Sequence, residues 1–411
     1  MIKEAIVLAG GKGTRLRSVV ADVPKPMAEV GDKPFLDHLL QKIISHGIER
    51  IVLSVGYKKE VIEDYFGNSF QGAEIVYAVE EEALGTGGAI KLALESCIDE
   101  QVFVFNGDTY LDLNLEAFAT QHLESGKSIS LALKEMNSPD RYGTVEVKYS
   151  RITDFREKQT GVESGLINAG VYALKSSLMQ NEVLPTVFSF ESEILEKKKD
   201  NWVIGAFTTN GFFVDIGVPE DYRRAHAYFS MPNVDSGWTL FLDRDGVINV
   251  RKIGDYIRSV EEFEFLPGAL EAIAGFSKIF KRIVVVTNQQ GIGKGLMTAQ
   301  DLNQIHRFMM DAVESAGGKI DKAYFCPALH KENDQCRKPN PGMAFKAKED
   351  FRDIEFDQCL MIGDSLSDIE FASNAGMPSV FITPEPYKYE VKLTDVQAIN
   401  LLELESYLRR R

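Results

Sequence analysis

The 411-residue sequence has few cysteines, no long apolar run and no excess of positive charge. Its four cysteines, Cys97, Cys326, Cys336 and Cys359, are too few and too scattered for a disulfide framework in a chain of this length. We therefore expect a reducing compartment, the cytoplasm. No apolar run approaches the roughly 18 residues that a membrane span requires, and residues 5–9 end in glycines instead of continuing as a secretory signal.

The formal net charge is −15, which argues against nucleic acid or an anionic membrane as a general partner. An anionic small-molecule substrate would then need a locally basic pocket. With 44% hydrophobic and 26% charged residues, the composition is that of an ordinary globular protein, and the length predicts two or three domains. Residues 231–237 are rich in turn formers and separate two periodic regions, so we expect a domain boundary there.

Residues 241–247, Phe-Leu-Asp-Arg-Asp-Gly-Val, are the most informative stretch of the sequence. They follow an apolar lead-in and therefore read as a buried strand running into a turn. Asp243 would be ionised at pH 7 and could attack phosphorus without a separate base. Asp245 would have to donate a proton to the leaving oxygen, which at pH 7 requires its pKa to be raised by about three units. A strand end with a plain Asp-Gly turn is the alternative.

In the first half, an apolar strand at 5–9 runs directly into Gly10, Gly11 and Gly13, with Arg15 close behind. Glycines allow the backbone to approach phosphates closely, and Lys12 and Arg15 add positive charge. Lys25 is held between two prolines on a stiff segment. The alternative is a tight strand-to-helix turn.

Helices and strands then alternate, with helices expected at 35–46 and 60–66 and strands at 51–55, 73–79 and 102–105. Residues 84–89 form a second small-residue turn that could open a helix or admit a flat base. Asp108 follows the strand at 102–105, and Asp215 follows another apolar run. Carboxylates at the carboxyl ends of strands suit Mg²⁺, although the sequence cannot show that these two meet.

By these motifs, Gly-Gly-Lys-Gly-Thr-Arg-Leu at 10–16, Pro-Lys-Pro-Met at 24–27 and Leu-Gly-Thr-Gly-Gly at 84–88, the first half resembles the sugar-phosphate nucleotidyltransferases. The resemblance implies Gly10, Gly11, Gly13 and Arg15 at the triphosphate with Lys25 beside it, Gly87 at the nucleoside, Asp108 and Asp215 on the metal, and Gly143, Glu157, Lys158 and Asn168 at the sugar phosphate. Gln159 stands where the family usually has proline, which puts the local loop shape in question.

The second half carries three further motifs. Residues 283–289 read as a strand that ends in Thr287, residues 336–339 contain Arg337 and Lys338, and residues 359–368 read as a strand that ends in Asp364 and Asp368. Together with Asp243 and Asp245 they resemble the haloacid dehalogenase phosphatases. That resemblance implies Asp243 as nucleophile, Asp245 as acid and base, Thr287 and Lys338 on the phosphoryl group, Asn288 and Arg337 at the substrate, and Asp243, Asp245 and Asp364 at Mg²⁺, with Asp368 in support.

Within that family the second half is similar to histidinol-phosphate and heptose 1,7-bisphosphate phosphatases, a branch that often carries a zinc loop. Cys326, His330 and Cys336 are present, but Asp334 and Ala328 stand where further ligands are expected. A structural zinc ion needs four ligands, so we expect the 326–336 loop to fold without Zn²⁺.

The sequence thus predicts an α/β chain of two Rossmann-like domains: a nucleotide-diphospho-sugar transferase fold at 1–232 and a haloacid dehalogenase-like fold at 238–411. We expect a bifunctional, Mg²⁺-dependent enzyme of NDP-heptose synthesis that uses small-molecule substrates, with GTP as the expected nucleotide. The alternative is a mannose 1-phosphate guanylyltransferase fused to a histidinol-phosphate-type or other sugar-phosphate phosphatase.

Overall fold

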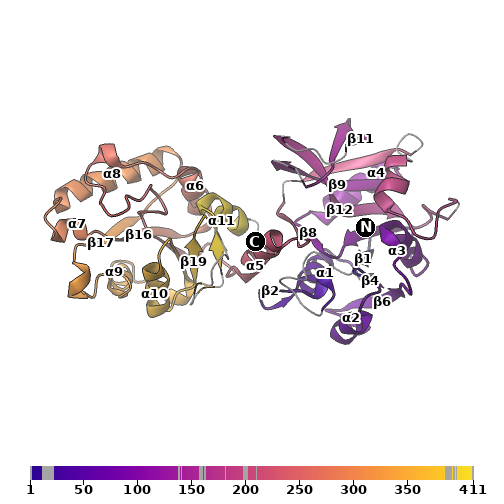
Figure 1. Cartoon of the computed structure of the whole chain (residues 1–411), viewed down its shortest axis with the longest axis horizontal. Helices are drawn as coiled ribbons and strands as arrows, with labels where there is room; N and C mark the ends of the chain where they lie inside the picture. The colour runs from indigo at the N-terminus through magenta and orange to yellow at the C-terminus, as the bar shows by residue number, and fades with distance from the viewer. Residues whose placement is uncertain are drawn as a thin grey trace. The chain divides into compact units, whose positions relative to one another are not determined.

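Figure 1 shows the computed structural model of the chain, which folds into two compact units, Met1–Ala225 and His226–Arg411. Each unit is described by itself. The structure describes residues 2–409 apart from 12–22, 138, 140, 157–160, 162, 181, 198–201, 210, 385–390, 392, 393 and 395.

The first unit is built on one mixed sheet in the order β10-β11-β13-β9-β12-β7-β1-β4-β6-β5. Its strands are β1 (Glu4–Leu8), β4 (Arg50–Val55), β5 (Ser69–Phe70), β6 (Ala73–Val79), β7 (Gln101–Asn106), β9 (Ile129–Asn137), β10 (Thr144–Lys148), β11 (Arg151–Arg156), β12 (Ser164–Lys175) and β13 (Ile204–Thr209). The neighbours β7, β1, β4 and β6 run parallel, whereas β12 pairs antiparallel with both β7 and β9. The carboxyl ends of the parallel strands therefore meet at one edge, where ligand sites gather in sheets of this kind.

Two small antiparallel sheets and five α-helices also belong to this part of the described chain. The small sheets pair β2 (Glu29–Val30) with β3 (Lys33–Pro34) and β8 (Thr109–Leu111) with β14 (Phe213–Asp215). The helices are α1 (Phe35–Ser45), α2 (Lys59–Phe66), α3 (Gly85–Leu94), α4 (Leu115–Ser125) and α5 (Pro219–Ser230). Helix α3 packs on β1, β4 and β6, and α4 packs on β9, β12 and β13. The boundary between the two units falls inside α5, a few residues before the turn-rich stretch 231–237.

The second unit has a fully parallel sheet in the order β17-β16-β15-β18-β19-β20. Its strands are β15 (Thr239–Leu242), β16 (Arg282–Asn288), β17 (Lys322–Cys326), β18 (Cys359–Gly363), β19 (Ser379–Ile382) and β20 (Gln397–Ala398). Phe241, Val284 and Met361 are completely buried in its core. Strands with both faces covered are continuous apolar runs, which is why the sequence pattern located β15, β16 and β18.

Helices cover both faces of this parallel sheet. They are α6 (Ala269–Ile279), α7 (Gln290–Gly293), α8 (Ala299–Ser315), α9 (Gly342–Asp350), α10 (Leu366–Ala375) and α11 (Leu401–Leu408). In Figure 1, α6, α8 and α11 lie on one face and α9 and α10 on the other. None of the helices that the structure describes is both long and apolar enough to cross a membrane. The α/β class and the two Rossmann-like domains predicted from the sequence are confirmed.

Candidate active sites

A cavity of about 300 Å³ lies at the end of β1, where the sequence analysis expects the nucleotide, and we call it the nucleotide cavity. Gly10, Gly11 and Lys25, which the sequence analysis assigns to the triphosphate, line it together with Asp108. A Cβ atom on Gly10 would lie 2.6 Å from the Glu80 Oε1 atom, so a side chain there would displace that carboxylate. Gly13 and Arg15, which the sequence places at the triphosphate, lie outside the described residues.

Glu80 is a residue of this cavity that the sequence analysis missed. Its carboxylate is held in place because the Ser54 hydroxyl donates to Oε1 at 3.0 Å and the Leu84 backbone N–H donates to Oε2 at 3.1 Å. The available signal was its position directly after the apolar run of β6. The cavity therefore combines a glycine-rich backbone with an oriented hydrogen-bond acceptor.

The two carboxylates assigned to the metal do meet, and they meet at Lys25. The Lys25 Nζ atom lies 2.5 Å from Asp108 Oδ2 and 3.2 Å from Asp215 Oδ1. The antiparallel pairing of β8 with β14 brings them together, because it places Asp215 opposite Thr109, the residue after Asp108. Burial and the neighbouring Asp108 charge raise the pKa of Asp215, an effect that Lys25 opposes. Two carboxylate groups around one cation form an oxygen-donor set that fits Mg²⁺.

Gly87, assigned to the nucleoside, has a different reason to be glycine. A Cβ atom there would lie 2.2 Å from the Phe188 ring, and the Gly87 N–H donates to the Phe188 carbonyl oxygen at 3.0 Å. Its neighbours Gly85 and Thr86 line the nucleotide cavity instead. The glycines of this turn thus let the segment before Glu191 pack closely on the start of α3.

Two further cavities, of about 350 and 480 Å³, lie where the sequence analysis expects the sugar phosphate, and we call them the sugar-side cavities. Gly143 and Asn168, both predicted to bind the sugar phosphate, line the two of them. The Asn168 side-chain amide donates to the Tyr172 hydroxyl at 2.8 Å, which fixes its orientation. Glu157 and Lys158, the other two residues of that prediction, lie outside the described part of the chain.

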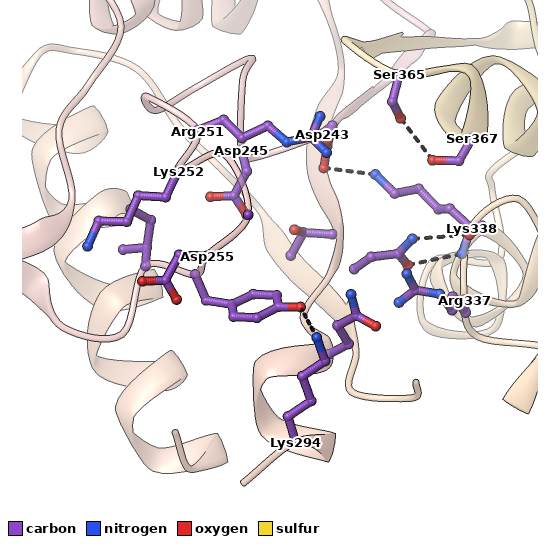
Figure 2. A pocket seen from close by; sticks show the side chains of 16 residues that line it. Asp243, Asp245, Arg251, Lys252, Asp255, Lys294, Arg337, Lys338, Ser365 and Ser367 are labelled. Carbon is purple, nitrogen blue, oxygen red and sulfur yellow. Dashed lines mark hydrogen bonds and ion pairs between the residues drawn. The ribbon is translucent and has the colours of Figure 1, made fainter. Parts of the chain in front are cut away.

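In the second unit, three adjacent parallel strands place the predicted phosphatase residues at one edge. Asp243 follows β15, Thr287 lies near the end of β16, and Asp364 follows β18. Figure 2 shows the cavity of about 410 Å³ that these strand ends open into. Asp243 and Thr287 line this cavity together with Ser365, the residue that follows Asp364.

Lys338 is the buried cation of this site. Its Nζ atom lies 2.8 Å from Asp243 Oδ1 and 2.5 Å from Asp368 Oδ1, and it also donates to the Val286 carbonyl oxygen at 2.9 Å. Asn288 fixes the backbone of Lys338 from both sides, with its Nδ2 donating to the Lys338 oxygen and its Oδ1 accepting from the Lys338 N–H (Figure 2). Because the lysine is paired with two carboxylates, its charge is retained in the buried site.

Asp243, Asp364 and Asp368 converge, with one carboxylate oxygen of each within 4.8 Å of the others. Burial and the Asp368 and Asp364 charges raise the pKa of Asp243 to about 7, against the opposing effect of Lys338. Asp364 Oδ1 is buried and has no hydrogen-bond partner among the described residues. A crowded acid cluster with an unpartnered oxygen fits a divalent cation, so these residues suit the Mg²⁺ site that the sequence predicts.

The carboxylate of Asp245 lies outside that acid cluster, and its pKa is lowered, whereas proton donation at pH 7 would require a raised pKa. Burial works to raise the pKa, but the adjacent Arg244 and hydrogen bonds from Asn249 and Gln289 lower it overall. Arg244 donates to both oxygens, at 3.0 and 2.8 Å, while Asn249 and Gln289 take one oxygen each. The physical reason is that these four hydrogen bonds stabilise the ionised form of the carboxylate.

Cations dominate the wall of the phosphatase cavity. Arg337 was predicted from the sequence, whereas Arg251 and Lys252 were missed, although they form an adjacent basic pair in an acidic chain. Lys294, opposite them, donates to the Tyr256 hydroxyl at 3.0 Å (Figure 2). Such a wall supplies the locally basic pocket that an anionic substrate of this acidic protein requires.

The 326–336 loop contains a disulfide that the sequence analysis did not expect. It joins Cys326 to Cys336, although the four scattered cysteines predict no disulfide framework. Asp334 lies beside the two sulfur atoms, whereas His330 is not part of this cluster within the described residues. The fold brings the end of β17 next to the segment that carries Lys338, a proximity that cysteine spacing alone does not reveal.

Comparison with known proteins agrees with the division of the chain into two units. Residues 4–230 match the nucleotidyl transferase family model, and residues 335–392 match a HAD-hydrolase-like model. Over 222 residues, 54% of this chain and 96% of the relative, the sequence is 45% identical to D-glycero-alpha-D-manno-heptose 1-phosphate guanylyltransferase of Aneurinibacillus thermoaerophilus. A further relative of the same half is mannose-1-phosphate guanylyltransferase of Mycobacterium tuberculosis, with 33% identity over 54% of this chain and 64% of that protein.

The second half has its own relative, and the first half has a solved structural neighbour. Over 137 residues, 33% of this chain and 72% of the relative, the sequence is 46% identical to D-glycero-alpha-D-manno-heptose-1,7-bisphosphate 7-phosphatase of Mycobacterium bovis. The crystal structure of HddC from Yersinia pseudotuberculosis complexed with GMP-PN aligns at a TM-score of 0.50 and 35% identity, covering 56% of this chain and all of that one. The chain therefore belongs to the nucleotidyl transferase family through its first half and to the HAD-like hydrolases through its second.

Proposed function

We propose that the chain is a bifunctional enzyme of GDP-heptose synthesis. Its second unit would remove the 7-phosphate of D-glycero-α-D-manno-heptose 1,7-bisphosphate, and its first unit would transfer GMP from GTP to the resulting heptose 1-phosphate. One observation carries the proposal: the relatives of the two halves are named for consecutive steps. The relative of the second half, at 46% identity, is a bisphosphate 7-phosphatase, and its product is the heptose 1-phosphate for which the relative of the first half, at 45% identity, is named. Both substrates are small molecules, and the cytoplasm stays the expected compartment.

In the phosphatase, Asp243 would attack the 7-phosphate. A bond forms between its carboxylate oxygen and phosphorus while the bond from phosphorus to the sugar oxygen breaks. Lys338, 2.8 Å from Asp243, and the Thr287 hydroxyl at the cavity wall would hold the transferred phosphoryl oxygens. Mg²⁺ on Asp243 and Asp364 would neutralise further charge on those oxygens.

Asp245 would act as acid in the first step and as base in the second. In the geometry described here it is ionised, which suits the second step, in which it takes a proton from the water that attacks the aspartyl-phosphate. The water oxygen bonds to phosphorus, the bond to Asp243 breaks, and inorganic phosphate leaves. For the first step Asp245 must be protonated, and the approach of a substrate phosphate dianion favours that form because it adds negative charge nearby.

In the transferase, no base is needed, because the phosphate oxygen of a sugar 1-phosphate is already ionised. That oxygen would bond to the α-phosphorus of the nucleoside triphosphate as the bond to pyrophosphate breaks. Lys25, between Asp108 and Asp215, would stabilise the charge at the α-phosphate, and Mg²⁺ on the two carboxylates would neutralise more of it. The glycines at 10 and 11 leave room for the phosphate chain.

Glu80 supports guanine as the base. Guanine presents two adjacent donors, N1–H and the N2 amino group, and a carboxylate can accept from both. The Glu80 carboxylate lines the nucleotide cavity in a fixed orientation, given by Ser54 and Leu84. Uracil and thymine offer one donor on that edge, so they would leave one oxygen unpaired.

The test is to incubate the full chain with heptose 1,7-bisphosphate, GTP and Mg²⁺. We expect one equivalent of inorganic phosphate, one of pyrophosphate, and a product with the mass of GDP-heptose. Release of phosphate from histidinol phosphate but not from the heptose bisphosphate would overturn the pathway assignment. The likeness to mannose-1-phosphate guanylyltransferase makes that activity the second candidate, and it is favoured if mannose 1-phosphate is used with the higher kcat/KM.

A further inference from the structure

Glu191 lies where the two sugar-side cavities meet. Glu191 lines the smaller cavity, which Asp215 also lines. It lines the larger cavity as well, together with Phe155 and Glu196. It is the first residue of the short π-helix Glu191–Glu196 (η3), which follows the segment packed on the Gly87 turn. In the proposed transferase, a carboxylate at this junction would face the part of the sugar that extends beyond the phosphate at carbon 1.

The two oxygens of Glu191 are used differently. Oε2 accepts from the Thr86 hydroxyl at 2.7 Å and from the Ser189 hydroxyl at 2.8 Å. Among the described residues, Oε1 accepts one long hydrogen bond, 3.5 Å from the Tyr172 hydroxyl, which itself accepts from the Asn168 amide at 2.8 Å. One oxygen is therefore anchored and the other retains acceptor capacity next to Asn168, a residue of the same cavity wall.

Among the described residues that line the larger cavity, acidic side chains outnumber basic ones. Glu191 and Glu196 are the acids, and the described cation, Arg156, is paired with Glu146. A sugar hydroxyl can donate a hydrogen bond to an ionised carboxylate, whereas a phosphate dianion can only be repelled by it. The same wall that binds a free hydroxyl thus excludes a second phosphate.

We propose that Glu191 is a specificity-determining residue of the transferase that accepts sugar 1-phosphates with free hydroxyls and rejects those carrying a second phosphate. This rests on the proposed transferase activity and adds an order to the two reactions. The bisphosphate would not be nucleotidylated until the phosphatase unit has removed its other phosphate. Discrimination by a repelling charge needs no contact between the two sites.

The experiment uses the full chain with Asp243→Asn, so that the bisphosphate survives, and measures pyrophosphate release with GTP. With this background alone, we expect kcat/KM for heptose 1-phosphate to exceed that for the 1,7-bisphosphate at least 100-fold. Adding Glu191→Gln should lower kcat/KM for the 1-phosphate about fivefold to tenfold and reduce the ratio between the two substrates at least tenfold. Glu196→Gln should change the ratio in the same direction.

Glu193→Gln is the matched control, since Glu193 lies on the same element but pairs with Lys197. It should leave the ratio unchanged. If Glu191→Gln raises KM for GTP and for the sugar alike without changing the ratio, Glu191 only holds η3 in place and the inference is overturned. If the background chain forms no nucleotide sugar from heptose 1-phosphate at all, the proposed function itself fails and the inference fails with it.

Discussion

Among single residues, Glu80 gives the sharpest test of how the nucleotide is chosen. Glu80→Gln keeps the shape but replaces one acceptor oxygen with an amide donor that faces the guanine donors. A lost charge-assisted hydrogen bond costs about 1.5–3 kcal/mol, so we expect kcat/KM with GTP to fall roughly 10- to 100-fold. The rates with ATP, CTP and UTP should change little, which a nucleotide panel with heptose 1-phosphate measures.

Glu81→Gln is the control, because Glu81 is exposed and is not among the residues that line the cavity. If Glu80→Gln retained the full preference for GTP, base recognition would have to lie elsewhere in the cavity.

The sequence predicted residue positions better than residue states. Asp243, Thr287 and Asp364 could be placed together because parallel strands end at one edge, and a run of apolar residues marks each strand. The pKa of Asp245 could not be predicted, because it depends on Asn249 and Gln289, whose side chains reach it only in the folded chain. Likewise, nothing in the sequence shows that Lys25 lies between Asp108 and Asp215.

Among structural elements, the turn after β15 depends on Gly246. Its φ is +93°, and a Cβ atom there would lie 2.0 Å from Asp364 Oδ2. Gly246→Ala would therefore strain the backbone and also displace a carboxylate assigned to the metal. We expect phosphate release to fall at least 100-fold, with a loss of about 1–3 kcal/mol in the stability of the second unit.

Gly317→Ala separates these two effects. Gly317 also has a positive φ, +82°, but a Cβ atom there would meet nothing within 4 Å. The Gly317→Ala variant should strain the backbone to a similar extent while leaving phosphate release and its Mg²⁺ dependence intact. Equal loss of phosphatase activity in both variants would show that strain, and not the position of Asp364, explains the first result.

Helix α4 carries a buried histidine whose charge state links stability to pH. Burial, then Lys175 and Lys127, lower the pKa of His122 to about 4, and its neutral ring bonds to Ser130 and Gln101. Because the unfolded chain takes up a proton near pH 6.5 and the native chain does not, stability falls as the pH drops from 6.5 to 4. The full loss is about 3 kcal/mol, and it is absent above pH 7.

The measurement is urea unfolding of the first unit at several pH values, followed by Trp202 fluorescence. The chain has two tryptophans, so a Trp238→Phe background leaves Trp202 as the reporter. His122→Gln should be less stable than this background at pH 7, and the difference should shrink as the pH approaches 4.5. A difference that stays constant over this range would contradict the assigned pKa.

The sequence pattern predicts some secondary-structure elements well but does not predict how distant strands pair. Buried parallel strands such as β1 and β16 were predicted within a residue or two, because both of their faces are covered and their apolar runs are continuous. The antiparallel part of the first sheet was not predicted as such. β12 pairs with β7 and β9, and that partnership depends on which long connection returns to the sheet. Local sequence carries no record of such distant pairing.

In the whole molecule, two cores serve two reactions. Each compact unit holds its own carboxylates and its own lysine, Lys25 in the first and Lys338 in the second. Among the described residues, each set is positioned by strands of its own unit. The activities should therefore be separable by point variants of the intact chain.

Two full-length variants test this separation in one vessel. Asp243→Asn should reduce phosphate release from heptose 1,7-bisphosphate at least about 1,000-fold because it removes the nucleophile, and it should retain transfer to heptose 1-phosphate. Asp108→Asn removes a charge from the pair around Lys25, so it should release phosphate normally but accumulate heptose 1-phosphate. Neither variant alone should convert the bisphosphate to GDP-heptose.

Mixed in equal amounts, the two variants should restore the product, because the 1-phosphate released by one diffuses to the other. Mass spectrometry would follow GDP-heptose, with phosphate and pyrophosphate assayed in parallel. Omitting Mg²⁺ and adding a chelator should stop both steps, and Mg²⁺ should restore both. If Asp108→Asn also abolishes phosphate release, or if the mixture stays inactive while each partial activity is present, the two sites do not work independently and the intermediate passes only within one chain.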